Sequence, residues 1–313
     1  MHIRHNPHSF LTGDDPFLPT IPIDRDDGSV IEELTFTPRH EGFIGIPHGG
    51  LAMGLCLDAW RRTSAPQYPA SVRFKFGGSG IGIGDTAIFE AQDSHDEQGP
   101  RVIAKITGNG DKTPYLRAEI RPAEQAGLST DIGKPPGDDF RELPYYRNCF
   151  VCGHHRTEPG LQRRFRLHEA RDETLVTAKW GFDGDDEDRT RYFLLGMEEL
   201  HPAVLTSIFD ENTAWAGFML TRCAGLSVRV ELTLIRPVAR NEKLLFVGKP
   251  AGIRGNPRSP RFFLGGGAIF SMRDPQSPEI VAYGRGEWVV LDQYTQQIKQ
   301  SLLPENEWEW IFG

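Results

Sequence analysis

The sequence of 313 residues contains no apolar run long enough to cross a lipid bilayer. Its most apolar stretch, Gly42–Trp60, is interrupted by Pro47, His48 and Asp58. The N-terminus also lacks the apolar segment of a secretory signal peptide. We therefore expect a cytoplasmic protein without a membrane partner.

The sequence also has few cysteines, and its net charge is negative. The chain has four cysteines, and two of them lie in apolar helical runs, where cysteine usually acts as a small buried hydrophobe. The formal charge is −8, with 35 basic and 43 acidic residues, which disfavours nucleic acid as a partner. The length suits two domains or one large duplicated unit.

Two segments of the chain resemble each other. His48–Trp60 and His201–Trp215 both begin with a histidine and small residues and continue as an apolar helical run with an acid near its middle. Strand-like segments follow each of them. The pattern predicts an internal duplication.

The repeats divide the chain into five parts. We expect an irregular N-terminal arm (1–30), a first repeat (31–122), a linker (123–147), a second repeat (148–292) and a C-terminal tail (293–313). Helices are predicted from about 49 to 62 and from about 202 to 222. Because both are apolar on nearly every side, they should be buried among antiparallel strands.

Several motifs of the second repeat occur in the order of a known family. They are Cys149-Phe150-Val151-Cys152-Gly153, Phe209-Asp210-Glu211-Asn212, Gly225-Leu226-Ser227-Val228 and the segment Ile235–Glu242. On these residues the chain resembles the PaaI-like hotdog-fold acyl-CoA thioesterase superfamily. The resemblance implies an α+β double hotdog, in which two antiparallel sheets each wrap a central helix, either as separate sheets or joined into one. It also implies hydrolysis of an acyl-CoA without a cofactor beyond the coenzyme A of the substrate, and Ser227 matches a family serine that holds water beside the acid.

Thioester hydrolysis requires N–H donors for the carbonyl oxygen and a base or nucleophile. The segment His48-Gly49-Gly50 begins a helix, and a helix start offers unpaired N–H groups. Asp210 lies nine residues after His201, roughly 13 Å along its own helix, which is too far to serve that helix's start. Asp210 should therefore act with the start of the other helix.

The two copies are complementary. The position of Asp210 is occupied in the first copy by Leu57, with Asp58 one residue further on, and Pro202 of the second copy has no N–H to donate. We predict one working site per chain, with Gly49 and Gly50 as donors and Asp210 as base or nucleophile. His48 would orient the loop, and Glu211 is a rival for the acid. The mirror site, Ala203 with Leu57, should be inactive.

Basic residues gather after the second helix, although the protein is acidic overall. They are predicted to bind the phosphates of coenzyme A, with a solvated loop as the alternative. The residues assigned to this role are Arg236, Arg240, Lys243 and Arg254.

Metal binding is not expected. Cys149 and Cys152, with His154 and His155 behind them, have the spacing of a zinc knuckle, but no second cysteine pair follows. A structural loop is the simpler interpretation of this segment.

Two other functions stay open for the duplicated fold. A hotdog hydratase is disfavoured because its usual Asp-x-Asn-Pro-x-His motif is absent. A non-catalytic protein that binds an acyl or aromatic ligand between the repeats would also show half-decayed motifs. The expected partner is a small acyl thioester, and two duplicated chains could pair as a homodimer.

Overall fold

The protein was analysed as a computed structural model. No helix among the described residues is long and apolar enough to span a membrane. The structure describes residues 7–23, 29–62, 66–77, 80–124, 139–170, 173–182, 189, 192–256, 258–305 and 307–312.

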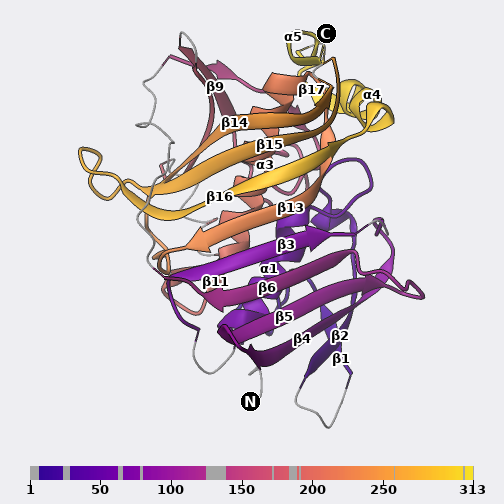
Figure 1. Cartoon of the computed structure of the whole chain (residues 1–313), viewed down its shortest axis with the longest axis vertical. Coiled ribbons are helices and arrows are strands. Elements are labelled where there is room, and N and C mark those ends of the chain that lie inside the picture. Colours follow the sequence, from indigo (N-terminus) through magenta and orange to yellow (C-terminus); the bar gives the residue numbers. More distant parts are fainter. Residues whose placement is uncertain are drawn as a thin grey trace.

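One large antiparallel sheet forms the front of the molecule in Figure 1. Its strand order is β1-β2-β4-β5-β6-β3-β13-β16-β15-β14-β10-β9-β7. The strands from the first half of the chain are β1 (Thr20–Pro22), β2 (Val30–Thr35), β3 (Ala70–Phe76), β4 (Thr86–Asp96), β5 (Gly99–Gly108) and β6 (Leu116–Pro122). Those from the second half are β7 (Arg141–Glu142), β9 (Phe165–Ala170), β10 (Glu173–Trp180), β13 (Gly225–Leu234), β14 (Leu244–Asn256), β15 (Ser259–Ser271) and β16 (Glu279–Val290).

The two halves of the sheet repeat one topology. The order β2-β4-β5-β6-β3 in the first half is mirrored by β10-β14-β15-β16-β13 in the second. β3 and β13 pair at the centre, with a register from Arg229↔Lys75 to Leu234↔Ala70. This confirms the predicted α+β class, and it shows that the two sheets are joined into one.

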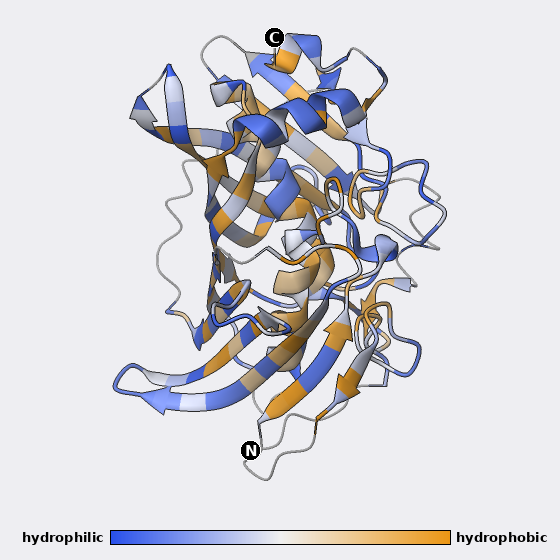
Figure 2. Cartoon of the chain, turned by 90° about the vertical axis from the view of Figure 1, so that its right-hand side faces the viewer, coloured by the Kyte–Doolittle hydropathy of each residue, from blue (hydrophilic) through white to orange (hydrophobic). Residues whose placement is uncertain are grey.

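Two buried helices lie behind the sheet, α1 (Gly49–Arg61) and α3 (Pro202–Thr221). They pack against each other at small residues. A Cβ atom on Gly50 would lie 2.2 Å from Cα of Ser207, and one on Gly54 would lie 2.2 Å from Cβ of Ala203. Small side chains therefore set how closely the helices approach. Figure 2 shows mainly apolar helical segments in the middle of the molecule, beside the strands.

Short elements complete the fold around the sheet. They are η1 (Pro38–His40), β8 (Tyr145–Tyr146), which pairs with β17 (Leu302–Leu303), and β11 (Leu194–Leu195), which pairs with β12 (Glu199–Leu200). Two tail helices follow the sheet, α4 (Asp292–Ser301) and α5 (Glu309–Phe312). The buried ring of Phe312 contacts Trp215 and Phe218 of α3, so the aromatic end of the tail docks on the body of the protein.

The segment before the first repeat also belongs to the core. Phe10, Leu11, Phe17 and Leu18 are buried, although their segment was expected to be an irregular arm. Most of the expected linker, residues 125–138, lies outside the described residues.

Candidate active site between the two repeats

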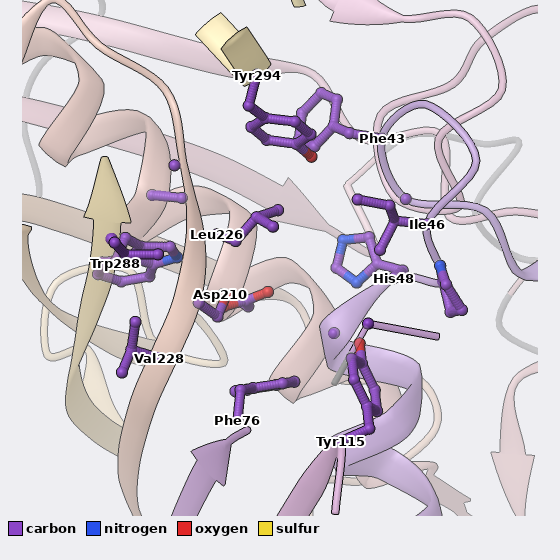
Figure 3. Close-up of a pocket in the computed structure, with 18 of the residues that line it drawn as sticks. Phe43, Ile46, His48, Phe76, Tyr115, Asp210, Leu226, Val228, Trp288 and Tyr294 are labelled. Carbon is purple, nitrogen blue, oxygen red and sulfur yellow. The ribbon is translucent and has the colours of Figure 1, made fainter. Parts of the chain in front are cut away.

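A cavity of about 670 Å³ opens where the start of α1 meets the middle of α3. Its lining is mostly aromatic and glycine-rich, with a few polar groups that point inward (Figure 3). The aromatic residues in the lining are Phe43, Phe76, Tyr115, Phe218, Phe262, Trp288 and Tyr294.

Asp210 and Glu211 are the two acids in the lining of this cavity, and they differ in their partners. Oδ1 of Asp210 accepts a hydrogen bond of 2.9 Å from the Ser227 hydroxyl. A β-bulge between Ser227 and Arg229 interrupts the pairing of β13 with β16, as bulges near functional sites often do. Burial raises the pKa of Asp210 to about 6, although His48 and Ser227 favour its charged form. Asp210 can therefore act as a base near neutral pH.

Gly49 lies directly opposite Asp210. A Cβ atom on Gly49 would be 3.2 Å from Asp210 Oδ2 and 3.3 Å from the Phe76 ring, so a side chain there would crowd the carboxylate. The Gly49 amide is at the first position of α1, where no intrahelical acceptor exists. This amide can donate to a ligand in the cavity.

Gly50 has a different role from the one predicted. Its amide donates to Nδ1 of His48 at 3.0 Å, which caps the helix. The Gly50 amide is thus already bonded, and its missing side chain admits Ser207 of α3. Of the two predicted donors, Gly49 alone has an amide with no acceptor among the described residues.

Both ring nitrogens of His48 are engaged within the protein. Nδ1 accepts from Gly50, and Nε2 lies 3.4 Å from Oε2 of Glu211. The same carboxylate oxygen accepts from the Cys149 thiol at 3.2 Å. Glu211 therefore anchors the helix cap, and its neighbour Asp210 faces the open cavity.

At the start of α3, the equivalent position in the other repeat, buried polar side chains contact one another. His201 caps α3 through the Ala203 amide and lies 3.1 Å from Oδ1 of Asp58. Hydroxyls of the N-terminal segment complete the contacts, Ser9 at 2.7 Å and Thr12 at 2.6 Å from the carboxylate.

Asp58 corresponds to Glu211 by its distance from the preceding histidine, and it too serves a helix cap. Arg62 Nε lies 3.1 Å from Asp58 Oδ2. Burial opposes ionisation, but His201 and Arg62 hold the pKa of Asp58 well below its usual range. The position of Asp210 is Leu57, fully buried, so this corner holds no carboxylate like Asp210.

The four basic residues assigned to coenzyme A do not form one site. Arg236 pairs with Glu242 and Glu279 near the end of β13, whereas Arg254 pairs with Glu287 at the opposite end of the sheet. The side chain of Arg240 donates to the Met197 carbonyl, and Lys243 lies over Phe182. Only Arg254 lies near the cavity, over the Phe262 ring that lines it.

Two tyrosines of the cavity were missed in the sequence. Tyr115 precedes β6 and Tyr294 belongs to α4, and Figure 3 shows both rings at the cavity with Asp210 between them. Burial raises the pKa of Tyr294 well above its usual value. Neither residue stands in a motif, and only the docking of the tail brings Tyr294 to the site.

Solved structures match nearly the whole chain. A putative thioesterase II from Thermobifida fusca has a TM-score of 0.57 at 13% identity, covering 87% of this chain and 96% of that one. Acyl-CoA thioesterase II TesB2 from Mycobacterium marinum has a TM-score of 0.52 at 16% identity, covering 88% and 95%. The dehydratase domain of PpsC from Mycobacterium tuberculosis, in complex with C12:1-CoA, also has a TM-score of 0.52 at 16% identity, covering 92% and 100%.

The chain has the double hotdog fold. No model of a protein family and no functionally curated protein matches its sequence. At these identities the structural likeness is one of fold, and thioesterases and dehydratases share it. The activity of this double hotdog therefore has to be argued from its site.

Proposed function

We propose that the protein hydrolyses an acyl thioester, with an acyl-CoA as the substrate. The observation that carries the proposal is the approach of the Asp210 carboxylate to Gly49 at the start of the other helix. One side of the cavity then offers a free backbone N–H, and the other offers a buried base with a pKa of about 6.

The reaction uses these groups in order. The Gly49 amide donates to the thioester carbonyl oxygen and stabilises the oxyanion that forms. Asp210 takes a proton from water as the water oxygen bonds to the carbonyl carbon, and Ser227 holds the carboxylate. The C–S bond then breaks, and Asp210 returns the proton to the departing thiolate. The products are a carboxylic acid and a thiol.

Two arginines at the β14–β15 hairpin support coenzyme A as the carrier of the acyl group, because they could bind its phosphates. Arg254 and Arg261 both place their guanidinium groups over Phe262, a lining residue of the cavity. Guanidinium groups suit phosphate oxygens. Because Arg236, Arg240 and Lys243 lie elsewhere, the hairpin replaces the predicted phosphate site.

A dehydratase is the less favoured function. Such chemistry on this cavity would need a second acid–base group beside Asp210, and His48 is the obvious candidate. Both nitrogens of His48 are bonded within the protein, so its ring is not free to exchange protons with a substrate.

Hydrolysis of an acyl-CoA panel tests the proposal. Asp210→Asn is expected to reduce kcat by about 100-fold or more, since it removes the base. Asp274→Asn, in the turn between β15 and β16, is the matched control and should retain full activity. Wild-type protein that binds a thioester without hydrolysing it would indicate a ligand-binding protein and reject the proposal.

A further inference from the structure

Two segments of similar sequence fill equivalent corners of the two repeats. Residues 9–13 read Ser-Phe-Leu-Thr-Gly, and residues 149–153 read Cys-Phe-Val-Cys-Gly. Each closes a turn with one backbone bond, from Gly13 to the Ser9 carbonyl at 2.8 Å and from Gly153 to the Cys149 carbonyl at 2.9 Å. The segments thus share a conformation, and their polar side chains differ.

We call Ser9, Thr12, Asp58 and His201 the hydroxyl corner. The negative charge of Asp58 is fully paired there. Two hydroxyls and the histidine contact the buried carboxylate. The guanidinium of Arg62, four residues after Asp58, balances its charge. No further group is needed to stabilise this acid.

The cysteine corner, defined as Cys149, Cys152, Glu211 and His48, has no arginine in the place of Arg62. Glu211 is 3% exposed, and its Oε1 has no hydrogen-bond partner in the described structure. Trp215 occupies the position that corresponds to Arg62. Among the described residues, no lysine or arginine forms an ion pair with Glu211, whose one ion-pair partner is His48.

Backbone amides in the cysteine corner also favour the thiolate form of Cys149. The Cys149 sulfur accepts from the amides of Val151 at 3.3 Å and Cys152 at 3.5 Å, an arrangement that stabilises negative charge on sulfur. The Cys152 side chain is fully buried in the same turn. One ligand atom each of His48, Cys149 and Glu211 lie within 4.8 Å of one another.

We propose that Cys149 and Glu211, with Cys152 as the second thiolate of the C-x-x-C turn, bind a divalent, thiophilic metal ion, with zinc as the preferred ion. Two sulfur ligands and a carboxylate in a buried corner are donors that zinc accepts in tetrahedral sites. The ion supplies the positive charge that Arg62 supplies in the hydroxyl corner. The sequence disfavoured a metal because no second ligand pair follows the cysteines, but the fold brings a third donor, Glu211 of α3, to the cysteine corner.

The role of His48 in this site depends on which ring nitrogen carries the proton. Because its Nδ1 accepts from Gly50, the neutral ring carries its proton on Nε2 and donates it towards Glu211. In this state His48 orients the ligand carboxylate. It becomes the fourth ligand only if the ring releases Gly50 and the proton moves to Nδ1.

Metal analysis of the full chain tests the site without reference to activity. The reduced protein is stripped with a chelator, loaded with Zn²⁺ or Co²⁺ and freed of excess ion. We expect one ion per chain by mass spectrometry, and near-ultraviolet absorption from cobalt bound to thiolate. Glu211→Gln should weaken cobalt binding by more than the roughly 10- to 100-fold that loss of an outer hydrogen-bond partner costs.

The chain itself provides a variant that keeps the corner filled. The double substitution C149S/C152T copies the hydroxyl corner and should fold but bind no ion. A C56S/C223S variant removes the other two thiols and should retain one ion per chain. If wild-type protein binds no more metal than C149S/C152T, the proposal is wrong, whether or not the protein hydrolyses thioesters.

Discussion

Two buried acids in equivalent helices have opposite electrostatic surroundings. Asp58 is held by Arg62, His201 and two hydroxyls, and its pKa lies well below its usual range. Asp210 has one hydroxyl partner, Ser227, and burial raises its pKa to about 6. Asp58 is therefore a structural ion, and Asp210 is held ready for proton transfer.

The two acids should respond oppositely to neutralisation. Asp210 has a folded-state pKa above its ordinary value of 3.8, so its charge lowers stability at pH values above about 6, and this penalty vanishes below about pH 4. Asp210→Asn should therefore raise the free energy of unfolding at about pH 8 by up to about 3 kcal/mol. Asp58→Asn should lower it by about 3–5 kcal/mol, because buried partners lose their counter-charge.

Urea denaturation at about pH 8 and about pH 4 measures both effects. A destabilised Asp210→Asn protein at the higher pH would contradict the assignment of Asp210 as a strained base.

Activity should follow the ionisation of Asp210. We expect kcat/KM to rise with pH through an apparent pKa near 6, because the carboxylate is the active form. Ser227→Ala removes a hydrogen bond that favours the charged form and should move this midpoint upward. The measurement is a pH-rate profile of the wild-type protein and the variant. An unchanged midpoint in the variant would show that Ser227 does not stabilise the charged form of Asp210.

At the scale of elements, small residues decide how α1 and α3 meet. Gly54 faces Ala203, and an added Cβ would lie 2.2 Å from the alanine methyl group. Gly54→Ala should therefore destabilise the protein by about 1–3 kcal/mol, although alanine favours helix elsewhere. Gly80→Ala, where a Cβ meets nothing within 4 Å, is the matched control. Equal stability of the two variants, measured by thermal unfolding, would show that the helices can separate freely.

At the scale of the whole molecule, the central strand pair joins the repeats. β3 and β13 bond along six residue pairs, and α1 packs on α3. We expect one cooperative unfolding transition, with coincident midpoints by tryptophan fluorescence and circular dichroism. Two separated transitions would show that the repeats fold independently.

Local patterns in the sequence predicted much of this fold. The bounds of α1 and α3 follow from two apolar runs that each begin after a histidine. Comparison of the two copies also pointed to Asp210 and Gly49, which the structure brings together. Asp210 could be found because its counterpart is Leu57.

Long-range contacts could not be predicted in the same way. Ser9 and Thr12 reach Asp58 across 49 and 46 residues, and Tyr294 reaches the cavity only through the docked tail. The pairing of Cys149 with Glu211 also joins distant segments. Local spacing does not identify the partner of any of these residues, because the packing of the sheet and helices decides which residues meet.

The central claim is that duplication has left one open site in each chain. Calorimetric titration with a non-hydrolysable thioether analogue of an acyl-CoA measures this directly. We predict one molecule bound per chain, and loss of binding in Gly49→Val, whose side chain would crowd Asp210. Two bound molecules per chain, or one that Gly49→Val leaves unaffected, would contradict the claim.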